Sequence, residues 1–241
     1  MARRHSLSII VPAYNEENTV VEILDKLRET KLRNVSAVEV LIINDSSTDN
    51  TKKRILDYKN EYPGFHLKYL EHEINKGKGA ALHTGFAQAT NDFVVIQDAD
   101  LEYDPSEIDL LFRPVLYDDA DVVYGSRFMG GSAHRILFFW HSIGNRFLTF
   151  LSNMATNLNL TDMETCYKLI RTDVLKSLTL KENRFGFEPE VTAKLSRVPN
   201  IKIYEVGISY YGRTYAEGKK INWKDGFRAI YCIIKYGFLR L

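Results

Sequence analysis

Residues Phe93–Glu102 read Phe-Val-Val-Ile-Gln-Asp-Ala-Asp-Leu-Glu. The apolar run indicates a buried strand, and three carboxylates follow where that strand ends. Alternate residues of an extended chain share a side, so Asp98 and Asp100 are expected to point the same way, and Glu102 can follow them. Crowded carboxylates repel one another and are costly to desolvate, and a divalent cation would remove both costs. Ligands that are all oxygen favour Mg²⁺ or Mn²⁺ bound with substrate phosphates, so the segment suggests an enzyme that handles a diphosphate. The simpler alternative is an acidic turn after a strand.

The rest of the first half alternates strand-like and helix-like segments. This spacing predicts an α/β fold with a mostly parallel sheet, whose ligands bind outside the carboxyl ends of the strands. Strands are expected at residues 7–11, 38–43, 66–70, 93–97 and 121–124, and a further one at 202–209. Polar clusters fall at several of the carboxyl ends, namely at residues 12–16, 44–49, 98–102 and 125–127.

Bulk composition excludes few classes of protein. The chain has 241 residues and a formal net charge of +1, so it fits one large domain and shows no global basic field. No basic stripe or recognised motif supports nucleic-acid binding. Cys166 and Cys232 form no metal-ligand motif and no disulfide framework, which favours a reducing, cytoplasmic location. The basic N-terminus lacks the apolar region of a signal peptide, and no apolar run approaches the roughly 20 residues that span a bilayer.

Two segments of the second half carry many apolar side chains. Residues 136–154 are dense in aromatics with arginine interspersed, and residues from 221 onward show apolar side chains at helical spacing. Aromatics mixed with arginine suit a membrane interface, so we expect peripheral attachment at the cytoplasmic face of a membrane. An interface with a second copy of the chain would show the same apolar surface, and a separate membrane protein is a further possible partner.

The sequence resembles the family 2 glycosyltransferases. The motifs that carry the resemblance begin with Ile9-Ile10-Val11-Pro12-Ala13-Tyr14-Asn15-Glu16, Asn44-Asp45-Ser46-Ser47-Thr48-Asp49 and Asp98-Ala99-Asp100-Leu101-Glu102. Gly125-Ser126-Arg127 and Arg213-Thr214-Tyr215-Ala216-Glu217-Gly218-Lys219 narrow it to the dolichol-phosphate mannose synthase branch and its bacterial polyprenyl-phosphate relatives.

The resemblance implies one GT-A domain over residues 1–241, with a nucleotide-sugar and metal half (1–130) and an acceptor half with amphipathic helices (131–241). It also implies an inverting transfer of a hexose, first of all mannose from GDP-mannose, to a polyprenyl or dolichyl phosphate, with Mg²⁺ or Mn²⁺. The catalytic residues implied are Asp100, Arg127 and Arg213, and the metal ligands are Asp98, Asp100 and Glu102. The residues expected to bind substrate are Pro12, Tyr14, Glu16, Ile43, Asp45, Asp98, Ala99, Asp100, Arg127, Lys168, Arg213 and Lys219.

Two departures from the family pattern bear on these assignments. Many relatives carry Gln where Glu102 stands, and many carry Ser where Gly218 stands. A phosphate acceptor is already anionic near neutral pH and needs orientation more than a base, whereas a sugar-hydroxyl acceptor needs a carboxylate base, for which Glu188 and Glu190 are the candidates. A UDP-sugar donor, a polysaccharide acceptor, a sugar nucleotidyltransferase and a non-catalytic nucleotide-sugar-binding protein are the alternatives.

Overall fold

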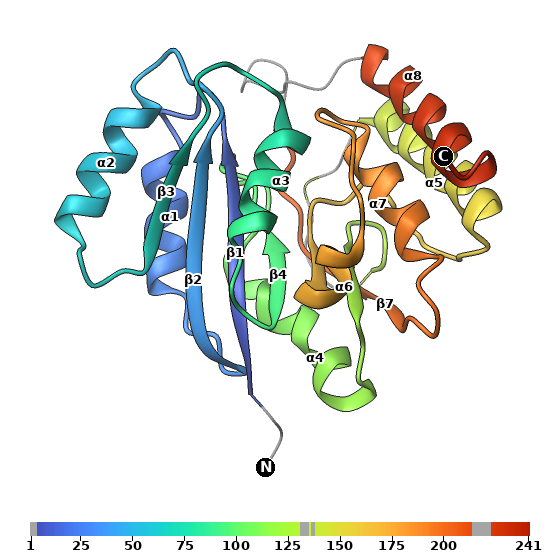
Figure 1. Cartoon of the computed structure of the whole chain (residues 1–241), viewed down its shortest axis with the longest axis horizontal. Helices are drawn as coiled ribbons and strands as arrows, with labels where there is room; N and C mark the ends of the chain where they lie inside the picture. The colour runs from blue at the N-terminus through green and yellow to red at the C-terminus, as the bar shows by residue number, and fades with distance from the viewer. Residues whose placement is uncertain (1–3, 131–134, 136–137, 214–222) are drawn as a thin grey trace.

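The computed structural model describes residues 4–130, 135, 138–213 and 223–241. Within these residues one seven-stranded sheet has the order β3-β2-β1-β4-β6-β5-β7, and helices cover both of its faces (Figure 1). The strands are β1 (His5–Ala13), β2 (Val35–Asn44), β3 (Leu67–Glu71), β4 (Phe93–Ile96), β5 (Val122–Ser126), β6 (Lys168–Arg171) and β7 (Ile203–Gly207). The helices are α1 (Val20–Glu29), α2 (Thr51–Glu61), α3 (Lys78–Gln88), η1 (Pro105–Glu107), α4 (Ile108–Asp118), α5 (Phe139–Thr156), α6 (Thr172–Ser177), α7 (Phe187–Leu195), α8 (Trp223–Cys232) and the π-helical η3 (Ile233–Phe238).

The mostly parallel sheet predicted from the sequence is confirmed. Strands β3, β2, β1 and β4 pair in parallel, and so do β5 and β7. The prediction missed β6, which lies between β4 and β5 and is antiparallel to both. Its four residues are too short to produce a periodic signal, and the pairing depends on contacts that are distant in sequence.

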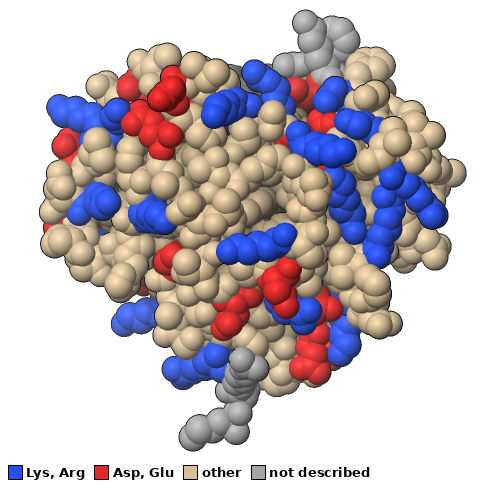
Figure 2. All heavy atoms as spheres, viewed as in Figure 1, with Lys and Arg blue, Asp and Glu red and all other residues tan. Residues whose placement is uncertain are grey.

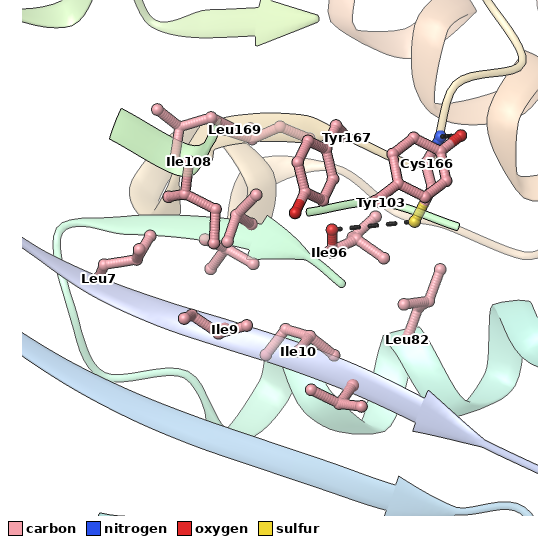
Figure 3. Close-up of a cluster of buried hydrophobic side chains, with 14 of the residues drawn as sticks. Leu7, Ile9, Ile10, Leu82, Ile96, Tyr103, Ile108, Cys166, Tyr167 and Leu169 are labelled. Atoms are coloured by element: carbon pink, nitrogen blue, oxygen red, sulfur yellow. Dashed lines mark hydrogen bonds between the residues drawn. The ribbon is translucent and has the colours of Figure 1, made fainter. Parts of the chain in front are cut away.

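The core lies on both faces of the central strands. Leu7, Ile9 and Ile10 of β1 are at most 1% exposed, and Figure 3 shows them within one cluster of apolar side chains that also includes Leu82 of α3. A strand buried on both faces reads as a continuous apolar run because neither face meets water. This burial fixes the strand ends from which the polar loops leave.

Both cysteines are buried and neither forms a disulfide. Of the helices in the described part of the chain, none combines the length and apolar character required to cross a bilayer.

Candidate active site

The polar segments after β1, β2 and β4 meet at one edge of the sheet. These strands are neighbours and run parallel, so their carboxyl ends lie together, at the top of Figure 1. Asn15 crosses between two of the loops: its backbone N–H donates to Ser47 Oγ at 3.0 Å, and its Oδ1 accepts from the Thr48 N–H at 2.8 Å. Asn15 has a φ of 50°, a conformation that asparagine tolerates better than most residues. The first two loops are thereby held against each other.

The residues expected around a nucleoside occupy this edge. Pro12 and Ile43 are paired in register between β1 and β2, and Ile43 is fully buried. Tyr14 is 37% exposed at the end of β1. The structure thus brings Pro12, Tyr14 and Ile43 to the same edge, and their contact with a nucleoside stays a prediction.

Asp45 holds the loop that leads into α3. Its Oδ1 accepts from the Lys76 backbone N–H at 2.9 Å and lies 2.7 Å from His72 Nδ1, and its Oδ2 accepts from the Gly77 N–H at 2.7 Å. Asp45 is 3% exposed, so the carboxylate acts first as a structural anchor. Its predicted role in nucleoside binding is not tested by these contacts.

Three carboxylates follow β4, as the sequence predicts, but their geometry differs from the expected one. The strand ends at Ile96, and residues 99–103 form a turn in which Leu101 has a φ of 64°. Because the backbone turns here, Asp98 and Asp100 take different partners. The extended alternation expected for this segment is therefore wrong.

Each of these carboxylates contacts a cation or a donor. Lys78 Nζ lies 2.9 Å from Asp98 Oδ1, and Arg213 Nη2 lies 2.8 Å from Asp100 Oδ2. Glu102 accepts from the Tyr210 hydroxyl at 2.6 Å and from the Arg213 backbone N–H at 2.7 Å. The loop after β4 is thus joined to α3 through Asp98 and to the segment after β7 through Asp100 and Glu102.

Arg213 also reaches the loop after β1. Its Nη1 lies 3.4 Å from Glu16 Oε2, and its Nε lies 3.7 Å from Glu102 Oε1. Arg213 therefore faces carboxylates from two segments that are far apart in the sequence, with Glu16 in the loop after β1 and Asp100 and Glu102 in the loop after β4. Glu16 and Ala99, which is 2% exposed, lie at this edge as well.

The crowded carboxylates shift one another's ionisation. Burial, reinforced by the charges of Asp98 and Glu102, raises the pKa of Asp100 to about 7. Burial works against the charge on Lys78, but the nearby Asp98 carboxylate outweighs it and raises the pKa of Lys78 well above its ordinary value. Such a site attracts positive charge strongly.

The donor set fits a Mg²⁺ or Mn²⁺ ion. The side chains of Asp98, Asp100 and Glu102 offer only oxygen, and burial together with the neighbouring carboxylates raises the pKa of Asp100, costs that a bound cation would offset. Among the described residues no three His, Cys, Asp or Glu side chains form a ready-made metal cage. A divalent ion that keeps waters and takes phosphate oxygens needs only one or two carboxylates from the protein.

Arg127 pairs with a residue that the sequence analysis did not single out. Its Nε and Nη2 donate to the two oxygens of Asp162, at 2.7 and 2.8 Å, and the Asp162 side chain is fully buried. Asn145 also donates to Asp162, at 3.0 Å. Asp162 lies 35 residues from Arg127 and in no motif, so no local signal marks it. The predicted phosphate role of Arg127 stays a prediction.

Lys168 lies inside the sheet. It begins β6, is 1% exposed, and donates from Nζ to the Thr165 carbonyl oxygen. Burial lowers the pKa of Lys168. Its predicted contact with a phosphate is untested, and this burial does not favour it. The predicted Lys219 lies outside the described residues.

The two carboxylates considered as a base have different environments. Glu190 is fully buried and accepts from the backbone N–H groups of Lys181 and Glu182, at 2.8 and 2.7 Å, and from Lys194 Nζ at 2.6 Å. Glu188 lies 3.8 Å from Lys78 Nζ. These contacts hold the Glu190 carboxylate in place, and its role as a base stays a prediction. Tyr210, which donates to Glu102, is a contact of the three carboxylates after β4 that sequence reasoning missed.

Comparison with protein families gives a clear match. A model described as Glycosyl transferase family 2 matches residues 8–179. A dolichyl-phosphate beta-glucosyltransferase of Trichomonas vaginalis is 30% identical over 217 residues, which cover 85% of this chain and 65% of that protein. A dolichol-phosphate mannosyltransferase of Pyrococcus furiosus is 25% identical over 236 residues, covering 95% of this chain and 64% of that protein. The chain therefore spans just under two thirds of the length of these two relatives.

Other relatives match over more of their length or in structure. A UDP-N-acetylglucosamine–dolichyl-phosphate N-acetylglucosaminyltransferase of Methanococcus voltae is 25% identical, with 94% of each chain covered. Glucosyl-3-phosphoglycerate synthase of Mycobacterium tuberculosis, solved with Mn²⁺, UDP and phosphoglyceric acid, has a TM-score of 0.71 at 19% identity, covering 96% of this chain and 78% of that one. A mannosyltransferase of Pyrobaculum calidifontis, solved with GDP-Man and Mn²⁺, has a TM-score of 0.62 at 19% identity, covering 87% and 57%. These two structures show a shared fold and confirm the predicted GT-A architecture.

Proposed function

Because the chain belongs to glycosyl transferase family 2, as its match over residues 8–179 shows, we propose that it transfers a hexose from a nucleoside-diphosphate sugar to a polyprenyl phosphate. The predicted family is thereby confirmed, and the protein is a glycosyltransferase. The named activities of relatives from Trichomonas, Methanococcus and Pyrococcus support a dolichyl-phosphate type of acceptor. Those names include glucosyl, N-acetylglucosaminyl and mannosyl transfer. We propose mannose from GDP-mannose as the first donor to test and UDP-sugars as the alternative.

One observation carries this proposal: Arg213 faces Glu16, Asp100 and Glu102, from the loops after β1 and β4. An arginine fork matches phosphate oxygens and carboxylates alike, and burial raises the strength of both interactions. A cation placed among acidic side chains at the carboxyl ends of parallel strands suits the binding of an anionic diphosphate with a metal. This arrangement gives no reason to prefer the two alternatives, a sugar nucleotidyltransferase or a non-catalytic binding protein.

The proposed reaction does not require the protein to act as a proton acceptor. An oxygen of the acceptor phosphate attacks the anomeric carbon, the bond from that carbon to the diphosphate breaks, and the nucleoside diphosphate leaves with the electron pair. A dianionic acceptor loses no proton in this step. Arg213 screens the charge on the reacting phosphates, while Asp45 holds the loop that carries Lys78. Glu190 is held by three donors, which disfavours it as the base for a hydroxyl acceptor.

We assign the metal to Asp100, with Asp98 and Glu102 beside it. A divalent ion there would neutralise charge on the leaving diphosphate as the glycosidic bond breaks. Structural neighbours were crystallised with Mn²⁺, which supports a divalent ion in this fold.

We also propose that the protein works at a membrane surface. Helices α5 and α8–η3 pack together and expose apolar side chains, which we call the α5–α8 surface. Lys and Arg side chains gather over α7 and α8 in Figure 2. Apolar and cationic side chains on neighbouring helices suit an anionic bilayer interface. The exposed apolar residues of this surface are Phe138, Phe139, Trp140, Ile143, Phe147, Phe150, Met154, Tyr231, Ile234 and Phe238.

Removing two of these aromatics is expected to weaken vesicle binding. Phe139 and Trp140 are 67% and 79% exposed, so their replacement by serine removes little packing within the protein. Each aromatic withdrawn from the interface should lower partition into anionic vesicles by about tenfold. Co-sedimentation with liposomes measures this, with Tyr117→Ser as the control because Tyr117 is 81% exposed on α4, away from this surface. If the wild-type protein does not bind vesicles and sediments as a dimer, the α5–α8 surface is instead the interface with a second copy of the chain.

A donor and acceptor panel tests the proposed reaction. Purified protein with Mn²⁺ or Mg²⁺ is given labelled GDP-mannose, UDP-glucose, UDP-galactose or UDP-GlcNAc, each with a short polyprenyl phosphate. We expect label to enter the organic phase with one donor and to depend on the metal. Tight donor binding by calorimetry without transfer to lipid would contradict the lipid-phosphate acceptor and favour a hydroxyl acceptor or a binding protein.

A further inference from the structure

The turn that carries Lys78 lies directly against a loop of the second half of the chain. Ala80 donates its backbone N–H to the Asn183 carbonyl oxygen at 3.1 Å. A Cβ at Gly79 would collide with the Glu182 carbonyl oxygen, and one at Gly77 would lie 2.5 Å from the Asn183 carbonyl oxygen. Gly77 also has a φ of 97°, which favours glycine. Both glycines are therefore required by the close approach of residues 182–184.

The Glu182 side chain joins this same loop to the C-terminal helices. Its Oε2 lies 2.6 Å from Arg228 Nη2 of α8, and its Oε1 accepts from the Tyr236 hydroxyl at 2.7 Å and lies 3.3 Å from Lys235 Nζ. Glu182 is 4% exposed, whereas the Arg228 side chain is half exposed, so the carboxylate end of these contacts is the part shielded from water. Its own backbone N–H is held by Glu190 at 2.7 Å.

Residues 182–184 thus contact both the Gly77–Gly79 turn, which carries Lys78, and the C-terminal helices α8 and η3. Beyond it, Lys78 Nζ lies 2.9 Å from Asp98 Oδ1 and 3.8 Å from Glu188 Oε1. We infer that Glu182 is a positioning residue, which couples the placement of α8 and η3 to the placement of Lys78 beside Asp98. The coupling itself stands on these contacts. Only the expectation that the Lys78 ammonium contacts the donor diphosphate rests on the proposed function.

The physical reason is that the buried Glu182 carboxylate is the shared partner of cations from both α8 and η3. Neutralising Glu182 removes the anion that Arg228 and Lys235 face, so α8 and η3 lose their common anchor. The loop at residues 182–184 then loses its side-chain contacts to α8 and η3, while the Glu190 carboxylate still accepts from its Glu182 N–H. Because the Gly77–Gly79 turn is packed on that loop, its local opening becomes easier. A disturbance of the α5–α8 surface would reach Lys78 by the same route.

Hydrogen exchange on the full chain tests the coupling without any transfer reaction. In Glu182→Gln we expect the amides of residues 76–82 to exchange about tenfold faster, together with those of residues 223–238. The matched control is Asp25→Asn, since Asp25 accepts from Arg28 Nη2 and the Tyr58 hydroxyl, both at 2.9 Å, on α1 and α2. The control should leave residues 76–82 unchanged. Faster exchange confined to residues 223–238 in Glu182→Gln would overturn the inference.

Two further measurements keep the test decisive. If Glu182→Gln fails to fold, Tyr236→Phe removes a single donor to Glu182 and should give the same pattern at smaller amplitude. Once the active donor is known, Glu182→Gln should raise the donor KM several-fold, because Lys78 is displaced. A purely structural role would lower the active fraction, and with it kcat, at unchanged KM. The exchange result stands even if the proposed reaction is wrong, so the two failures are distinguishable.

Discussion

Replacing Asp100 with asparagine is expected to lower sugar transfer by about 10²- to 10³-fold, because a metal that stabilises the leaving diphosphate contributes several kcal/mol. Burial and the charges of Asp98 and Glu102 raise the pKa of Asp100 to about 7. Asparagine keeps the size of the side chain and removes the charge. The expected loss is therefore electrostatic, and the fold should survive it.

Initial rates of label transfer at saturating metal measure this effect, and metal titration by calorimetry separates binding from chemistry. The control is Asp118→Asn at the exposed end of α4, which makes the same chemical change away from the three carboxylates that follow β4. A variant that keeps more than about a tenth of the wild-type rate would show that Asp98 or Glu102 carries the metal instead. Asp98→Asn and Glu102→Gln then decide between those two.

Asp100→Asn also removes one of the carboxylate partners of Arg213. The guanidinium lies 2.8 Å from Asp100 Oδ2 and 3.4 Å from Glu16 Oε2, so it partly neutralises the charge of these two carboxylates. A divalent cation held by these carboxylates would compete with Arg213 for them, which would leave the guanidinium available to the donor phosphates. Binding of metal and binding of donor should therefore be mutually dependent, which calorimetry with each alone and with both can measure.

Much of the fold could be predicted from the sequence because its central strands are buried on both faces. Val40 to Ile43 are at most 1% exposed, and a run of such residues between turn signals is recognisable without a structure. The four residues of β6 were not recognisable, since their antiparallel pairing with β4 and β5 is set by tertiary contacts. Short strands inserted from a distant segment carry no period of their own.

The residues of the site could be found, but not their partners. Asp98 and Asp100 were identified by residue type and by position after a strand, while the extended geometry assumed for them was wrong because Leu101 turns the chain at a φ of 64°. Arg213 was identified through the resemblance alone. Its contacts join positions that are 113 and 197 residues apart, a separation that no local pattern reports.

The buried pair of Arg127 and Asp162 carries the largest expected effect on stability. Asp162→Ala leaves the Arg127 guanidinium buried without its bidentate partner and should lower the free energy of unfolding by roughly 3–5 kcal/mol. Urea unfolding measures the change. Asp173→Ala is the control: its pair with Arg171 is 72% exposed on the carboxylate side, and it should cost at most about 1 kcal/mol.

The same pair predicts a pH dependence of defined sign. Burial opposes the charge of Asp162, but Arg127 outweighs it and holds the pKa of Asp162 below its ordinary value. The folded pKa therefore lies below the unfolded one, so the stabilisation is complete above the unfolded pKa and is lost as pH falls through the folded one. The difference in unfolding free energy between wild type and Asp162→Ala should stay constant from neutral pH down to about pH 5 and shrink below about pH 4.

This experiment also decides what Arg127 does. Arg127→Ala removes the guanidinium and leaves the Asp162 carboxylate, which is fully buried, with Asn145 as its remaining side-chain donor. If Arg127 serves the fold, Arg127→Ala and Asp162→Ala should destabilise the protein comparably, and the double variant should cost less than their sum because each single change already breaks the pair. If Arg127 instead contacts a phosphate, Arg127→Ala should lose transfer in protein that is still folded, while Asp162→Ala keeps more of the activity. Additive stability losses in the double variant would contradict the coupling of the two side chains.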